Sequence, residues 1–184
     1  MRSPETIELS ELREFLSKCW MTHDAMWFHH CVQECGIDTA NRINRAAVRS
    51  MAKIEVKRMM KILDCPSIGD MDQLKSFLEA ALWLIKADFM KFQPSFPSEN
   101  TYRWDMPECF AFEGVSRIGA IDEYQCGIFT RLEGWLDGIG VRYTAEPPIE
   151  GCLMHDHGRC YREFSIQFPR EQGDIAAHTD GDRS

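Results

Sequence analysis

The stretch CYREFSIQF, residues 160–168, decides the fold class that the sequence predicts. Every second residue, from Cys160 through Arg162 and Phe164 to Phe168, falls on one side of an extended chain. Side chains of a β-strand point alternately to the two faces of its sheet, so this alternation predicts a strand with one buried face. We therefore expect it to belong to a small, mainly antiparallel sheet.

The residues before this strand predict further strands and short helices. Aromatic residues near period two, interrupted by two prolines and an asparagine, predict two strands joined by a turn over residues 89–106. Residues 141–144 predict another strand, which a Pro-Pro pair ends. Apolar residues at helical spacing predict short helices over residues 108–119 and 126–138.

The first half of the sequence predicts three helices, over residues 6–35, 38–63 and 70–88. Gly36 is a natural stop for the first helix, and Asp38 can cap the second. The first helix carries an apolar and aromatic stripe at three- and four-residue spacing on one side. The stripe comprises Leu9, Leu12, Leu16, Cys19, Trp20, His23, Trp27, His30 and Cys31.

Together these elements predict an α+β fold. An N-terminal helical part of about three helices, residues 6–88, packs with a small mainly antiparallel sheet and short helices, residues 89–168. The length of 184 residues fits a single domain over residues 1–168. Residues 169–184 are polar and predict a disordered tail.

The composition excludes several classes of protein. No apolar run approaches the ~20 residues of a membrane span, and the first residues lack the apolar region of a secretory signal. The net charge of −8 arises in residues 66–184, which carry eleven Lys or Arg against twenty Asp or Glu. This acidic half disfavours nucleic acid as a partner. We expect a cytoplasmic bacterial protein with no membrane partner.

The second predicted helix carries a basic stripe. The stripe comprises Arg42, Arg45, Arg49, Lys53, Lys57 and Lys61. Such a stripe is usually the solvated face of an amphipathic helix. It could also face an anionic ligand, an anionic membrane, the acidic half of the chain or another subunit. Because the charge split favours a self-complementary contact, we expect a homodimer.

Eight cysteines are many for a chain without an export signal, and in a reducing compartment we expect thiols or metal ligands. Cys109, Cys126, Cys152 and Cys160 form the candidate metal set. Cys126 precedes a predicted helix, whose N-terminus favours a thiolate, and a tight polar loop separates Cys152 from Cys160. Buried cysteines also occur simply as small apolar residues.

Zinc is the metal that this set favours, in a closed tetrahedral site with a structural role. Four thiolates would also suit an iron–sulfur cluster, which is the alternative cofactor. Glu150 and His157 are alternative fourth ligands beside the cysteines, and His155 lies next to them in the sequence.

The segments YQCGIFTRLEGW, residues 124–135, and CYREF, residues 160–164, with Cys152 between them, resemble the C-terminal part of 4-vinyl-reductase-like domains. These domains are small-molecule-binding α+β modules of bacterial aromatic-compound sensors. Several hold zinc with a cysteine ahead of a helix, two later cysteines about eight residues apart and an acidic ligand. The resemblance implies zinc at Cys126, Cys152 and Cys160, with Glu150 or Cys109 as the fourth ligand.

The same stretch resembles a mostly uncharacterised bacterial family of L-2-amino-thiazoline-4-carboxylic acid hydrolase-like proteins. The segment HDAMW, residues 23–27, is similar to a helix of those proteins. The two resemblances together cover residues 15–168. The second implies a hydrolase acting on a small cyclic amide-like or thiazoline substrate.

His23, Asp24 and His30 are the candidate catalytic residues, because a histidine can act as general base and Asp24 can orient a polar group. Trp20 and Trp27 are candidate pocket walls on the same helix. The alternative is an amphipathic helix whose histidines pack at its boundary. Phe28, Trp83, Trp104 and Trp135 are further aromatic residues that could line a pocket.

Three functions therefore remain open from the sequence. The first is a small-molecule-binding protein of unknown ligand with structural zinc. The second is the hydrolase, and the third is an iron–sulfur or redox protein.

Overall fold

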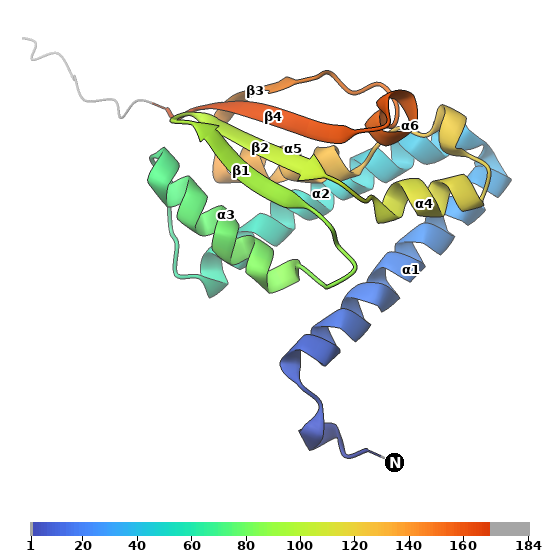
Figure 1. Ribbon diagram of the computed structural model, residues 1–184, viewed down its shortest axis with the longest axis horizontal. Coiled ribbons are helices and arrows are strands. Elements are labelled where there is room, and N and C mark those ends of the chain that lie inside the picture. Colours follow the sequence, from blue (N-terminus) through green and yellow to red (C-terminus); the bar gives the residue numbers. More distant parts are fainter. Residues whose placement is uncertain (1, 170–184) are drawn as a thin grey trace, which may run out of the picture.

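The computed structural model describes residues 2–169, so the predicted disordered tail falls almost entirely outside the described residues. The fold is α+β, as predicted: three N-terminal helices pack against a four-stranded antiparallel sheet, with short helices between (Figure 1). The helices are α1 (Leu9–Cys35), α2 (Ile37–Ile62), α3 (Met71–Ile85), α4 (Phe110–Arg117), α5 (Ile128–Ile139) and α6 (Leu153–His157). The strands are β1 (Gln93–Ser98), β2 (Thr101–Met106), β3 (Arg142–Glu146) and β4 (Cys160–Gln167), and the 3₁₀ turns are η1 (Pro4–Thr6) and η2 (Ile121–Glu123).

The strand predicted first from the sequence lies inside the sheet, whose order is β1-β2-β4-β3. β4 pairs with β2 on one side, where Arg162 lies opposite Trp104, and with β3 on the other, where Ile166 lies opposite Tyr143. Phe164 of β4 is completely buried. The alternation of residues 160–168 thus reflects one face of an interior strand that the core covers.

The α2 and α5 helices form the closest helix pair, and their contact depends on small residues. A Cβ atom added to Gly134 of α5 would lie 2.6 Å from the Cβ atom of Ala52 in α2. Gly138, one turn later, faces Val56 in the same way. The absent side chains let the two helix backbones approach, and α5 then packs between α2 and the sheet (Figure 1).

Ion pairs reinforce this contact from the basic stripe of α2. Arg49 donates to Asp137 of α5 at 2.8 Å, and the Lys53 ammonium lies 3.4 Å from the same carboxylate. Arg45 donates to Gln125 at 3.1 Å. Part of the stripe therefore bonds to the acidic half of this same chain.

The α1 helix is exceptional, because Phe28 is its only buried side chain in 27 residues. Its N-terminal half projects away from the rest of the molecule (Figure 1). The predicted apolar stripe does lie along one side of the helix, but most of its side chains are exposed to solvent rather than packed on the core. Within the described residues, no helix is both long and apolar enough to cross a membrane.

Candidate functional site

A groove of about 650 Å³ is bounded by α1, α2, α4, α5 and β2, and its volume is within the size range of small-molecule sites. Its walls are mainly apolar and aromatic. They include Phe28 of α1, Met51 of α2, Trp104 of β2, Phe110 of α4 and Leu132 of α5. Each wall comes from a different element, so the tertiary fold alone assembles this groove.

Trp104 lines the groove and carries an unpaired hydrogen-bond donor. The side chain is 3% exposed and stacks on Phe92, with the ring centroids 4.3 Å apart. Its indole Nε1 has no hydrogen-bond partner among the described residues. A buried N–H without an acceptor costs roughly 1–3 kcal/mol, and buried indoles usually find a partner. A bound molecule with an acceptor atom would remove this cost.

Asp24 of α1 and Arg131 of α5 add charge to the groove lining. Arg131 is already neutralised, because its Nε and one terminal nitrogen donate to the two carboxylate oxygens of Glu55 at 2.9 and 2.6 Å. Its guanidinium also lies 5.0 Å from the ring centre of Trp20, which forms part of the same wall. Desolvation raises the pKa of Asp24, although the charges of His23 and Arg131 oppose this shift. Asp24 is thus a carboxyl group without a strong cation partner.

The three candidate catalytic residues do not form a hydrogen-bonded group in the described structure. His23 is exposed, and His30 Nδ1 lies 3.0 Å from Gln33 Oε1 instead of facing Asp24. Of the two tryptophans expected in a pocket wall, Trp20 lines the groove and Trp27, 57% exposed, is not part of its lining. The groove therefore contains Asp24 without an adjacent histidine bonded to it.

The four candidate metal ligands occupy junctions between elements. Cys109 caps α4, and its sulfur accepts the Phe112 N–H at 3.5 Å. Cys152 precedes α6, and Cys160 begins β4 opposite the last residue of β2. Cys126 precedes α5, and its backbone N–H donates to the carbonyl of Gly151, beside Cys152, at 3.4 Å. All four are free cysteines.

The four thiols are close enough to affect one another electrostatically. Burial raises the pKa of Cys109, Cys126 and Cys160, that of Cys126 to about 12. The charges of neighbouring cysteines, Cys152 among them, raise these pKa values further. Backbone N–H groups at the start of α5 partly oppose the shift at Cys126. In this state these three groups are neutral thiols at pH 7.

Across residues 2–169, no group of three or more His, Cys, Asp or Glu side chains could hold a metal ion as the side chains stand. Glu150 and His157 are exposed, and His155 lies 3.2 Å from Asp122. A metal at the four cysteines thus requires the thiols to rotate and lose their protons.

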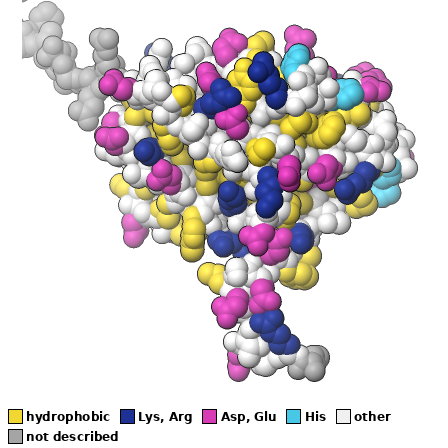
Figure 2. Space-filling view, in the orientation of Figure 1, with side chains coloured by type: hydrophobic (Ala, Val, Ile, Leu, Met, Phe, Trp, Pro, Cys, Tyr) yellow, Lys and Arg dark blue, Asp and Glu magenta, His cyan; other side chains and the backbone are white. Residues whose placement is uncertain are grey.

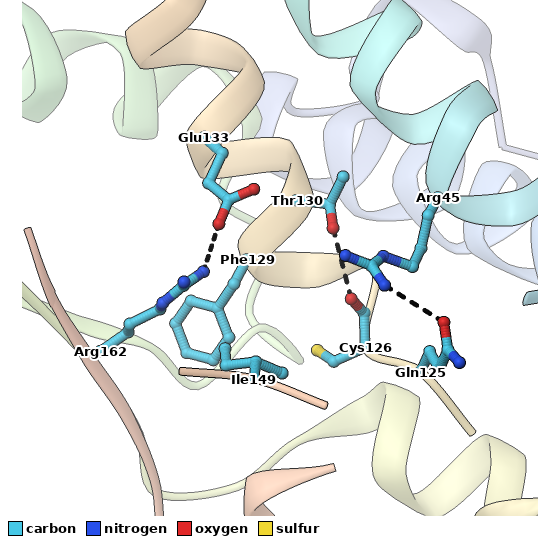
Figure 3. A pocket seen from close by; sticks show the side chains of 8 residues that line it. All are labelled: Arg45, Gln125, Cys126, Phe129, Thr130, Glu133, Ile149 and Arg162. Atoms are coloured by element: carbon cyan, nitrogen blue, oxygen red, sulfur yellow. Dashed lines mark hydrogen bonds and ion pairs between the residues drawn. The ribbon is translucent and has the colours of Figure 1, made fainter. Parts of the chain in front are cut away.

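A second cavity, of about 60 Å³, lies beside Cys126 and is too small for an organic ligand (Figure 3). Arg162 and Glu133 form an ion pair on one side of it, and Arg45 bonds to Gln125 on the other. This volume suits one or two water molecules.

Sequence reasoning named six aromatic residues for a pocket. Trp20, Phe28, Trp104 and Trp135 line the groove, whereas Trp27 and Trp83 are exposed and are not part of its lining. Sequence reasoning missed the bond between Glu55 and Arg131. No local pattern could reveal this pair, since its members lie 76 residues apart on two helices.

Comparison with known proteins gives one family match. A family model described as a family of unknown function (DUF6125) matches residues 5–130, more than half of the chain. No curated protein and no solved structure matches the chain. The matched residues include α1 and α4 but not Cys152 or Cys160.

Proposed function

The chain belongs to DUF6125, a family of unknown function, and from its own geometry we propose that it binds a small, mostly apolar molecule in the groove. The observation that carries this proposal is the mainly apolar groove of about 650 Å³, whose lining includes Trp104, a residue with a buried and unpaired N–H. An apolar cavity with a few polar groups is the usual form of a ligand site. The resemblance to 4-vinyl-reductase-like domains supports the same function.

The test uses N-phenyl-1-naphthylamine, an apolar dye that fluoresces when shielded from water. We expect the dye to bind saturably, at one molecule per chain. Gly114, on the α4 wall of the groove, is a suitable position for a side chain that blocks the groove, because a Cβ atom there would meet nothing within 4 Å. Gly114→Phe adds a ring from that position and should weaken dye binding at least tenfold.

Gly114→Ala is the matched control, and it should bind the dye like the wild type. Circular dichroism must show that both variants remain folded. Equal dye binding by the Gly114→Phe variant and the wild type would mean that the groove is not the binding site.

We also propose that zinc binds at Cys109, Cys126, Cys152 and Cys160. The supporting observation is that four free thiols from four segments lie near enough to act on the pKa values within the set. Two of these segments precede α4 and α5, the walls of the groove. Bound zinc supplies a crosslink between these segments and no chemistry on the ligand. The exposed Glu150 and His157 are weaker candidates for the fourth position.

Metal analysis of anaerobically purified protein tests the zinc proposal. We expect about one zinc per chain and no visible colour. Cys126→Ser and Cys160→Ser should each lose most of the zinc, while Cys35→Ser, an exposed thiol on α1, should keep it. Iron with a brown chromophore would instead establish the iron–sulfur alternative. Zinc retained by both site variants would place the metal elsewhere.

The hydrolase alternative receives less support than binding. Hydrolysis by His23, Asp24 and His30 requires a base bonded to its partner group, and no hydrogen bond joins these three side chains in the described structure.

A further inference from the structure

The exposed stripe of α1 is the largest unexplained apolar feature of the described surface. Leu9 is 65% exposed, Leu12 44%, Phe15 62%, Leu16 55% and Trp27 57%. At ~150–250 Å² for each large apolar side chain, five such residues expose on the order of 500 Å². The largest apolar patch of a typical monomer is ~300–600 Å², and such patches often bind a partner.

This stripe faces away from the body of the protein. With 3.6 residues per turn, Leu12, Cys19 and His23 lie on the side of α1 opposite the buried Phe28. The helix therefore contacts its own chain through one side and leaves the other free. Figure 2 shows the N-terminal half of α1 as a narrow stalk that extends from the body, with apolar side chains where the two meet.

The spacing of the apolar residues in the stripe is typical of helices that pack side by side in pairs. Leu9, Leu12, Leu16, Cys19 and His23 follow one another at alternating intervals of three and four residues. An apolar seam of this period, about 3.5 residues, packs best against another helix that carries the same period. α1 of a second copy meets that requirement.

The polar groups at the two ends of the seam favour an antiparallel pair. Glu8 and Glu11 lie at the N-terminal end of α1, where Glu11 pairs with Arg2 at 2.8 Å, and His29, His30 and Glu34 lie at its C-terminal end. An antiparallel arrangement centred near Cys19 places the acidic end of each helix beside the histidines of the other. A parallel arrangement would place like groups together, which is unfavourable.

We propose that α1 forms an antiparallel pair with α1 of a second copy of this chain, through the seam from Leu9 to His30. Closing the pair buries the exposed stripe of both copies and brings the two Cys19 residues close to the two-fold axis. The exposed stripe alone supplies on the order of 500 Å² of the ~800 Å² that each partner buries in a standard interface. This contact does not depend on the ligand or on zinc.

Light scattering during gel filtration of the full chain tests the pair. We expect a dimer of the 21.3 kDa chain at micromolar concentration. The double variant Leu12→Lys/Leu16→Lys should be monomeric, because it places four charges in the seam of each pair. Ile62→Lys is the matched control, since Ile62 is 67% exposed at the end of α2 and lies off the seam. It should remain dimeric.

Disulfide mapping tests the orientation, with Cys19 replaced by Ser. A mixture of a Leu9→Cys variant with a His30→Cys variant should form a crosslink between these two cysteines, identified by mass spectrometry. The Leu9→Cys variant alone should not form a crosslink between its new cysteines. A crosslink in that single variant would mean a parallel pair and would overturn the proposed arrangement.

Two further outcomes would also overturn the proposal. A monomeric wild type at micromolar concentration would show that α1 does not pair with itself. A double variant that is folded by circular dichroism and still dimeric would place the interface elsewhere.

Discussion

At the scale of single residues, Trp104 is the most informative side chain of the groove lining. The sequence identified it only as one of several aromatic residues. Its burial and its unpaired N–H arise from contacts with Phe92 and from the pairing of β2 with β4. Such properties depend on residues distant in the chain, so sequence periodicity could not predict them.

The Trp104 N–H should make the groove prefer ligands with an acceptor atom. We expect 2-acetylnaphthalene to bind about tenfold more tightly than 2-isopropylnaphthalene, because one hydrogen bond contributes about 1 kcal/mol. Trp104→Phe should abolish this preference while keeping an aromatic wall. Competition against N-phenyl-1-naphthylamine measures both affinities.

Trp135→Phe is the control for that experiment. Trp135 also lines the groove, but its N–H already donates to Glu55 at 2.8 Å. The preference should therefore survive this change. If Trp104→Phe keeps the preference as well, the indole N–H of Trp104 does not contact the ligand.

Glu55 is a residue whose loss should cost substantial stability, because its ion pair is largely buried. Its carboxylate accepts hydrogen bonds from Arg131 and Trp135, and the Arg131 and Glu55 side chains are only 17% and 14% exposed. Glu55→Ala leaves a largely buried guanidinium unpaired, and we expect the free energy of unfolding to fall by about 3 kcal/mol.

Urea denaturation measures this loss, and Glu113→Ala provides the comparison. Glu113 pairs with Arg117 on the exposed side of α4, where ion pairs contribute under about 1 kcal/mol. Equal losses in the two variants would contradict the proposed importance of burial for the pair of Glu55 and Arg131.

At the scale of elements, the sequence predicted the three long helices and the strands within a few residues of their bounds. Local patterns carried this information: alternation in β4, the cap of Asp70 on α3 and Gly36 after α1. The segment before Cys160 was predicted as a polar loop with no helix or strand, yet it contains the short helix α6. A helix of five residues has too few turns to show a period.

Local sequence patterns also could not predict which side of α1 packs against the rest of the chain. Its stripe shows which side is apolar, but not whether the partner surface belongs to the same chain. The structure packs Phe28 against Tyr124 and leaves the stripe exposed.

The contact between α2 and α5 should be intolerant of added volume. Gly134→Ala places a methyl group 2.6 Å from the Ala52 Cβ atom, so the helices must separate. We expect a loss of about 1–3 kcal/mol of stability in urea denaturation. Gly114→Ala in α4 is the matched control. Its Cβ atom has free space, and the better helix propensity of alanine should add about 0.5–1 kcal/mol. If Gly134→Ala leaves the stability unchanged, the backbones of α2 and α5 do not approach so closely.

At the scale of the whole molecule, the cysteines connect folding to pH. In the metal-free protein, burial raises the pKa values of Cys109, Cys126 and Cys160 above the ordinary thiol value of about 9. Burial likewise raises the pKa of Tyr143 to about 12. As the pH rises above about 9, the unfolded chain loses these protons first and the folded chain keeps them. Alkaline pH therefore favours the unfolded state.

We accordingly expect the free energy of unfolding of the metal-free protein to be highest below about pH 9 and to fall progressively from there towards pH 12. Denaturation in urea at several pH values, with a reductant and a chelator present, measures this slope. Cys126→Ser should make the slope shallower, because one buried thiol is gone and the tyrosine contribution remains. Cys35→Ser, an exposed thiol at the end of α1 and beyond the seam, should leave it unchanged.

Zinc should add a second pH dependence of the opposite sign, at lower pH. Thiolate ligands must release their protons to bind zinc, so the stability that zinc adds should grow as the pH rises from 6 to 8 and disappear in acid. The same denaturation series with one equivalent of zinc, at each pH, gives the difference between the two forms. A difference that is independent of pH, or one that survives Cys126→Ser unchanged, would mean that the four cysteines do not hold the metal. They would then be free thiols that pack as small apolar side chains at the junctions between β2, α4, α5 and β4.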